Sequence, residues 1–335
     1  MAGHDESKMK LETKRHYLVG PYEALKKGIF ITASCLIIFI ALRNSLIWHV
    51  EQCWGASKNF WSSIWAVFYW LSGENFFNMY IYGVWLLGIF TFTIGNIFFL
   101  VLDLTGKPSV FLRYKIQEDK GVPVSWMKYK KALWRCAFNI VVVVLLFQLV
   151  MYPLAVLGRM HAGYELPTFA TTVLHFTGYM VIEEIGFYYT HRLFHHPWLY
   201  KYIHKTHHEW TAPTGITSVY SHPLEHFVGN LGPMGLGPII MGSHVSIACL
   251  WIIIAVVNTT ISHSGYHLPF LPSSEAHDFH HLKFNQNYGV FGVLDRLHGT
   301  DEQFRQSKNY ERHIVLLGLN PAKQLFPNTQ KRNAD

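Results

Sequence analysis

Histidines spaced three or four residues apart constrain this fold more than any other feature of the sequence. Fourteen of the 21 histidines fall between residues 191 and 281. Residues three and four apart share one face of a helix, so each run can aim two or three imidazoles at one point. The four runs are His191, His195 and His196; His204, His207 and His208; His263 and His267; and His277, His280 and His281.

A metal ion is the target that such runs favour. Imidazoles packed together without a metal would each need a hydrogen-bond partner, and their charged forms would repel one another. Neutral imidazole is the commonest protein metal ligand, and it suits iron, zinc and copper better than magnesium or calcium. Zinc sites take only about three or four protein ligands. Because the runs supply more imidazoles than one ion can use, we predict a cluster of two redox-active first-row metals.

The composition indicates a membrane protein. Half of the 335 residues are hydrophobic and only 15% are charged, whereas a soluble globular protein carries roughly 25% charged residues. The formal net charge is +7. The basic residues cluster beside apolar segments, which is typical of membrane topology, so we predict no nucleic-acid partner.

Apolar segments long enough to cross a bilayer occur along most of the chain, since a spanning helix needs about 20 such residues. The expected spans are residues 29–50, 79–102, 136–158 and 168–189, followed by the longer apolar stretch 228–261. Gly-Pro pairs interrupt that stretch, which predicts a helical hairpin or a re-entrant pair. The expected fold is an all-α integral membrane protein, a bundle of about four to six transmembrane or re-entrant helices with a cytosolic helical cap that holds the histidine-rich di-metal site.

Basic residues give the orientation. The segment 103–135 carries eight lysines and arginines, whereas the segments 51–75 and 159–167 carry only Lys58 and Arg159. Under the positive-inside rule, the basic segment and the N-terminus face the cytosol, and every histidine run reaches the same side. We therefore expect a multi-pass protein with both termini in the cytosol.

The chain divides into four parts on this interpretation. Residues 1–28 form a cytosolic N-terminal segment without an obvious cleavage site, so the apolar stretch after it is expected to stay as a signal anchor. Residues 29–167 hold transmembrane helices and the basic cytosolic loop. Residues 168–305 form the catalytic region, and residues 306–335 form a cytosolic C-terminal tail.

The spacing HxxxHH, HxxHH, HxxxH and HxxHH on a membrane protein resembles the fatty acid hydroxylase superfamily, which includes sterol desaturases and C4-methyl sterol oxidases. The resemblance covers roughly residues 170–305. The stretch from His277 to Thr300, with Asn287-Tyr288-Gly289 and Leu294-Asp295-Arg296, looks like the C4-methyl sterol oxidase branch. Ser221-His222-Pro223-Leu224-Glu225-His226 also looks like that branch.

The resemblance implies a set of metal ligands, position by position. The implied ligands are His191, His195, His204, His207, His208, His263, His267, His277, His280 and His281. His196 competes with His195, and His222 and His226 are further candidates for ligands or for neighbours of ligands. A ligating imidazole usually donates its other N–H to a carboxylate or carbonyl. The acids placed to accept it are Glu183, Glu184, Glu225, Asp278 and Asp295.

The resemblance also implies cofactors, partners and location. It implies two iron ions, although another first-row metal remains open, and O2 as the oxidant. The resemblance further implies that electrons come from NAD(P)H through a cytochrome b5 or reductase. The chain has no His-Pro-Gly-Gly signature of a fused b5 domain, so we expect the donor to be a separate protein. The implied location is the endoplasmic reticulum membrane, where sterol-pathway enzymes are possible partners.

The expected function is oxidation of a membrane lipid, with a C4-methyl group of a sterol precursor as the leading substrate. One alternative is hydroxylation or desaturation of another sterol position or of an acyl chain. A second alternative, from a different class, is a non-catalytic membrane scaffold with a signalling role. The intact histidine set favours the enzyme.

Overall fold

The computed structural model describes residues 59–120 and 122–328, together with scattered positions between 26 and 57. The expected cytosolic segment 1–28, much of the expected span 29–50 and the end of the C-terminal tail lie outside the described residues. The chain divides into two compact units, residues 1–62 and residues 63–335. All four histidine runs belong to the second unit.

Helices make up the second unit, and its described residues contain no strand, only two isolated backbone bridges. The longer helices are α3 (Val84–Thr105), α4 (Trp126–Phe138), α5 (Val144–Leu157), α6 (Phe169–Phe194), α9 (Gly232–Ile240), α10 (Val245–Ser262) and α11 (Glu275–Lys283). The shorter helices are α2 (Phe76–Asn78), α7 (Pro197–Tyr200), α8 (Pro223–Glu225), α12 (Val293–His298), α13 (Glu302–Arg305), α14 (Lys308–Arg312) and α15 (Ala322–Leu325). The tighter 3₁₀ turns are η2 (Ser109–Tyr114), η4 (His204–Glu209) and η5 (Gly215–Val219), and the wider π turns are η1 (Met79–Gly83), η3 (Asn139–Val143) and η6 (His226–Leu231).

Three helical stretches of the described chain are long and apolar enough to cross a membrane: Phe76–Thr105, Trp126–Leu157 and Val245–Ser262. They confirm the expected spans 79–102 and 136–158. The second stretch begins ten residues earlier than expected, at the point where Ser125 caps the helix. The additional residues 126–135 are rich in lysine and arginine, and their charged groups lie near the end of the helix. The Nζ of Lys128 lies 3.9 Å from the centre of the Trp210 ring.

The broken apolar stretch forms two helices joined by a turn, which fits both expected forms, a helical hairpin or a re-entrant pair. Helices α9 and α10 are joined by a short turn, and α9 packs closely on α6. A Cβ at Gly237 would lie 3.0 Å from the Tyr179 ring, so the absence of a side chain allows that approach. Helix α6, with 26 residues, is long enough to span. It is not among the three apolar stretches, because polar residues and two glutamates interrupt it.

The two ends of the bundle are marked by different contacts. At one end, the basic segment between α3 and α4 pairs with the residues after His263, through an antiparallel bridge between Lys115 and Tyr266. At the other end, His161 pairs with His244 at the turn between α9 and α10. The basic segment and the histidine runs therefore share one end, as the charge distribution predicts. The assignment of this end to the cytosol stays a prediction.

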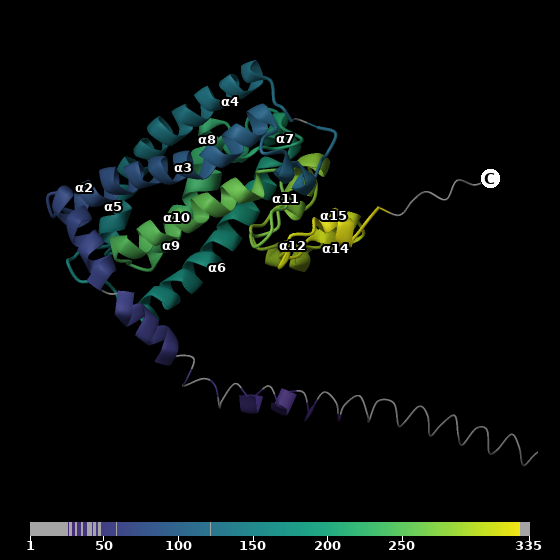
Figure 1. Ribbon diagram of the computed structural model, residues 1–335. Coiled ribbons are helices and arrows are strands. Elements are labelled where there is room, and N and C mark those ends of the chain that lie inside the picture. Colours follow the sequence, from purple (N-terminus) through teal and green to yellow (C-terminus); the bar gives the residue numbers. More distant parts are fainter. Residues whose placement is uncertain are drawn as a thin grey trace, which may run out of the picture. The chain divides into compact units, whose positions relative to one another are not determined.

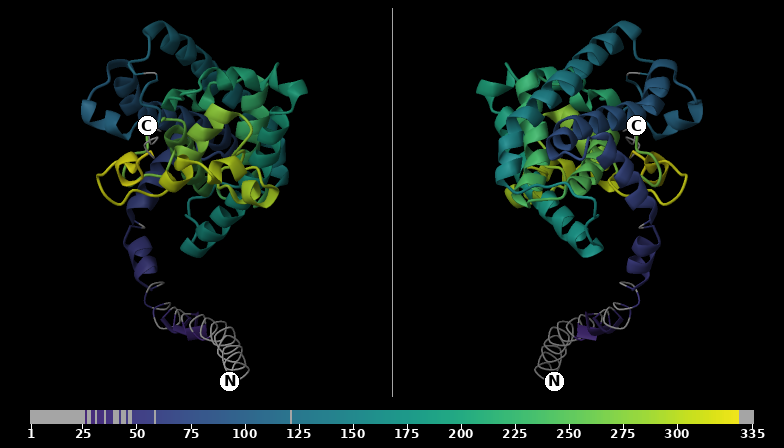
Figure 2. Two further views of the ribbon diagram at one scale, coloured as in Figure 1. Left: turned by 90° about the vertical axis from the view of Figure 1, so that its right-hand side faces the viewer. Right: turned by 90° about the vertical axis from the view of Figure 1, so that its left-hand side faces the viewer.

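Short helices cover the histidine end. Figure 1 shows α11, α12, α14 and α15 gathered at one end of the long helices α3, α6 and α10. The two views in Figure 2 show the same C-terminal helices, in yellow, held against the bundle. Arg312 in α14 donates hydrogen bonds to the carbonyl of Phe326 at 2.9 and 2.7 Å, which fixes the described end of the chain. Within this cap, α11 carries the last of the four histidine runs.

Candidate metal centre

Nine histidines gather into two adjacent groups, and within each group the potential ligand atoms all lie within 4.8 Å of one another. The first group is His191, His195, His204, His208 and His280, and the second is His207, His263, His277 and His281. The side chains come from the end of α6, from η4, from the residue after α10 and from α11. Segments that are far apart in the sequence thus meet at one place.

Neighbouring histidines divide between the two groups. His207 and His208 are adjacent on η4, and His280 and His281 are adjacent on α11, yet each pair contributes one member to each group. Successive residues of a helix point about 100° apart, so adjacent side chains serve two targets and residues four apart serve one. The two pairs of adjacent histidines, one on η4 and one on α11, therefore link the two groups and hold them side by side.

Hydrogen bonds fix five of these rings through Nδ1. The Nδ1 contacts are His191 to Tyr288 O at 2.8 Å, His204 to Glu225 Oε1 at 2.8 Å, His207 to Tyr220 O at 3.2 Å, His263 to Thr259 O at 2.8 Å, and His280 to Gln286 O at 2.6 Å. A carbonyl oxygen only accepts, so the four Nδ1 atoms that face carbonyls carry the hydrogen. In a neutral ring this leaves Nε2 with a free lone pair that faces its group.

The resulting lone pairs fit a cation. His207 and His263 both donate through Nδ1, and their Nε2 atoms lie 3.4 Å apart with no hydrogen between them in the neutral rings. His280 Nε2 is buried and has no hydrogen-bond partner among the described residues. Facing lone pairs repel unless a positive ion lies between them, so these donor atoms match a metal.

Burial keeps the rings in the form that binds metal. Burial lowers the pKa of His207 to about 4, although the hydrogen bond to Tyr220 raises it in part. Burial, together with the neighbouring His191 and His207, lowers the pKa of His195 to about 2. At neutral pH both rings are therefore uncharged, which is the form that coordinates metals.

The remaining histidine candidates lie elsewhere. His267 is outside both groups: its Nε2 lies 2.8 Å from Ile314 O, and its Nδ1 lies 3.4 Å from Glu275 Oε1. The exposed His196 and the partly exposed His222 accept hydrogen bonds from Trp198 N and Leu224 N, and so cap α7 and α8. The structure does not bring these three side chains to the groups.

His226 also lies outside both groups, in the wall of a neighbouring cavity. Its Nδ1 accepts a hydrogen bond of 3.3 Å from the Asn230 amide, and its buried Nε2 has no partner among the described residues.

The five acids have different roles. Glu225 contacts a grouped histidine, His204. Glu184 accepts hydrogen bonds from the backbone N–H groups of Val290, Phe291 and Leu294 at 2.8–3.1 Å.

Asp295 accepts from Tyr288 N and Gly289 N at 2.8 and 2.7 Å, so it clamps the loop whose Tyr288 carbonyl holds His191. Asp278 accepts from Gln117 Nε2 at 2.9 Å, and Glu183 lines the same cavity as His226.

A pair of adjacent histidines provides a direct test of this placement. His195→Ala removes a member of the first group, and we expect it to lower the metal content of the purified protein by about one ion per chain. His196→Ala removes only a helix cap, which costs about 1 kcal/mol, and should leave the metal content unchanged. Elemental analysis of both variants makes the comparison, and equal metal loss in the two would contradict the assignment.

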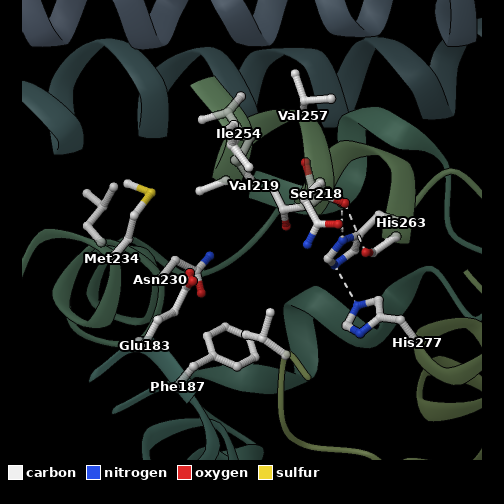
Figure 3. A pocket seen from close by; sticks show the side chains of 18 of the residues that line it. Glu183, Phe187, Ser218, Val219, Asn230, Met234, Ile254, Val257, His263 and His277 are labelled. Carbon is white, nitrogen blue, oxygen red and sulfur yellow. Dashed lines mark hydrogen bonds between the residues drawn. The ribbon is translucent and has the colours of Figure 1, made fainter. Parts of the chain in front are cut away.

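The cavity beside the grouped histidines has a volume of about 840 Å³, within the size range of small-molecule sites. Figure 3 shows His263 and His277 on one side of it and Glu183 and Asn230 on the opposite side. Apolar side chains such as Phe187 form most of the wall between them. The cavity therefore offers an apolar molecule a place next to the metal centre.

A helical membrane protein with a histidine-lined metal site beside an apolar cavity is a membrane-bound oxidoreductase in its general class. The chain belongs to the fatty acid hydroxylase family, whose model matches residues 176–300. Fatty acid hydroxylase domain-containing protein 2 of Homo sapiens is 43% identical over 332 residues, which cover 99% of this chain and 98% of the relative.

Other relatives carry names that state an activity. Fatty acid hydroxylase ahd1 of Mycosarcoma maydis is 37% identical over 71% of this chain and 62% of its own length. Methylsterol monooxygenase 1 of Gallus gallus is 34% identical over 60% of this chain and 70% of its own length. No solved structure matches the chain.

Proposed function

We propose that the protein oxidises a C4-methyl group of a sterol precursor, with O2 as oxidant and a pair of iron ions held by the nine grouped histidines. The observation that carries this proposal is the meeting of two imidazole groups, five of whose histidines line a mainly apolar cavity. The relative named as a methylsterol monooxygenase supports the substrate class. His267 is left out of the proposed ligand set because both of its ring nitrogens face protein oxygens.

The residues of the chain bind and orient both metals and substrate. The Nδ1 hydrogen bonds of His191, His207, His263 and His280 hold the rings so that their Nε2 atoms face the ions. Glu225 holds His204 in the same way. The apolar wall excludes water and places a C–H bond against the centre. When bound, the iron pair supplies the activation of O2, which side chains alone lack.

The overall reaction defines the partners. One oxygen atom enters the C–H bond and the other leaves as water, which consumes two electrons and two protons for each hydroxylation. We propose that the electrons come from NAD(P)H through a separate cytochrome b5 and its reductase. We also propose that the protein resides in the endoplasmic reticulum membrane. The histidine end faces the cytosol in this proposal, because the basic segment shares that end.

A second candidate is the hydroxylation of an acyl chain. The relative named fatty acid hydroxylase ahd1 favours it, because it covers more of this chain than the named methylsterol monooxygenase does. The cavity wall is apolar enough for either a sterol ring system or an acyl chain.

Purified iron-loaded protein with a reductase, cytochrome b5 and NADPH tests the two candidates together. We expect conversion of a 4,4-dimethyl sterol to its 4-hydroxymethyl and 4-carboxy products, detected by mass spectrometry. A matched reaction receives a long-chain acyl lipid in place of the sterol. Oxidation of the acyl lipid without oxidation of the sterol would replace the main proposal with the second candidate.

A further inference from the structure

A buried serine hydroxyl faces the cavity near the metal centre without a protein partner. Ser218 in η5 is 3% exposed, lines the cavity, and its Oγ has no hydrogen bond to any residue that the structure describes. Figure 3 shows it on the side of the cavity where His263 and His277 lie. A buried hydroxyl normally has a partner, so its partner is expected to be a molecule in the cavity.

A second polar side chain lies on the neighbouring helix. Asn258 is in α10, which contacts η5, and it lines the same cavity. It is half-buried and stands in an otherwise apolar part of that helix. It precedes His263 by five residues, a rise of about 7.5 Å along the helix. Asn258 is thus near the metal end as well.

The polar residues across the cavity are less suited to a group beside the metals. Asn230 already donates to His226 at 3.3 Å. Glu183 precedes His191 by eight residues of α6, a rise of about 12 Å, so its carboxylate is remote from the centre. A substrate group held by Ser218 and Asn258 would instead lie close to the reacting carbon.

We propose that Ser218 and Asn258 bind a neutral hydroxyl group that the lipid carries on the ring carbon next to the methyl-bearing carbon. This inference rests on the proposed function, because a 4-methyl sterol has its 3-hydroxyl at that place. A serine hydroxyl and an asparagine amide each offer a donor and an acceptor, as a lipid hydroxyl requires. Neither supplies the positive charge that binds a carboxylate or phosphate.

The remainder of the sterol then extends away from the metals. The cavity continues between α3 and α5, where its lining includes Val84, Ile89, Val144 and Phe147. These side chains offer dispersion contacts and no hydrogen bonds to the ring system and side chain. The hydroxyl contact sets the position of the molecule along the cavity, and hence which carbon meets the metal centre.

Two probes that differ only by the hydroxyl test the proposal: 4,4-dimethyl-5α-cholestan-3β-ol and 4,4-dimethyl-5α-cholestane. Each displaces a radiolabelled dimethyl sterol from full-length, iron-loaded protein in nanodiscs without O2. We expect the wild type to prefer the hydroxylated probe by about tenfold. Ser218→Ala and Asn258→Leu should each reduce this preference to about threefold, and the double variant should abolish it. Ser218→Thr keeps a hydroxyl and should preserve much of it.

The preference ratio separates recognition from general damage, because binding of the probe without a hydroxyl should change little. Glu183→Gln and Asn230→Ala are matched controls across the cavity and should leave the ratio unchanged. The proposal is overturned if the double variant still prefers the hydroxylated probe tenfold. It is also overturned if the two control variants lose this preference. Hydroxyl preference in this binding assay, together with no oxidation of the sterol in the reconstituted reaction with O2, would refute the proposed function alone. Oxidation of the sterol in that reaction without hydroxyl preference in binding would refute this inference alone.

Discussion

His280→Ala is expected to reduce turnover at least 100-fold and to remove about one of two iron ions per chain. His280 Nε2 belongs to the first group and has no hydrogen-bond partner among the described residues, so its loss removes a metal donor and no protein contact of that atom. A 100-fold loss corresponds to about 2.7 kcal/mol of transition-state stabilisation. Product formation and iron content are measured on the same membrane-extracted preparation.

His281→Ala is the matched variant, because His281 is adjacent and equally buried but belongs to the second group. We expect it to lose the other ion and to be equally inactive, while the double variant retains neither ion. Retention of turnover in either single variant would exclude that histidine from the centre. Loss of both ions from each single variant would show that the groups bind as one unit, against the proposed division into two.

Glu225→Leu is expected to weaken metal binding 10- to 100-fold without removing a ligand. Glu225 Oε1 lies 2.8 Å from His204 Nδ1, and a carboxylate in this position fixes the ring and makes it a stronger donor. Both side chains are buried. Replacement of the acid by leucine leaves the Nδ1 hydrogen without an acceptor in an apolar setting. Iron affinity is measured by competition with a chelator.

Two controls accompany this variant. Glu225→Gln keeps an oxygen acceptor for His204 and should retain most of the affinity. His222→Ala removes the cap of the same short helix and should leave affinity unaltered, since His222 contacts Leu224 N and no grouped histidine. Unaltered affinity in Glu225→Leu would show that this hydrogen bond does not support the metal site.

Apolar length and residue spacing predicted the main helices and pointed to the nine histidines that the structure gathers into two groups. Apolar length predicted the two spans that contain α3 and α5, and the breaks in the stretch 228–261 predicted its division into two helices. The Gly-Pro pairs themselves lie at the start of α9 and inside it, and the turn falls at Gly242, which has a positive φ. Spacing at three and four residues indicates which residues share a helical face. Spacing does not determine that His207 and His208 belong to different groups, because this depends on where the histidines at the ends of α6 and α10 and in α11 lie in space.

Tertiary contacts account for the differences. His267 fits the spacing of its run, but the chain turns after α10, and Ile314 O and Glu275 face its ring. The acceptors that orient the other rings include the carbonyls of Tyr220, Gln286 and Tyr288. Every residue has a backbone carbonyl, so these acceptors cannot be identified from residue type.

Glu184 is a further example of a tertiary contact. It is among the acids placed to accept an imidazole N–H, whereas its carboxylate accepts hydrogen bonds from the backbone N–H groups of Val290, Phe291 and Leu294.

The iron content of the full-length protein, extracted from membranes and reconstituted with ferrous iron without O2, tests the central claim most directly. Two imidazole groups built from five and four histidines should hold two ions per chain, close enough for magnetic coupling to be seen by Mössbauer spectroscopy in a field. Two coupled ions per chain is the expected result. Fewer than one ion per chain, or two ions without coupling, would contradict a paired metal centre.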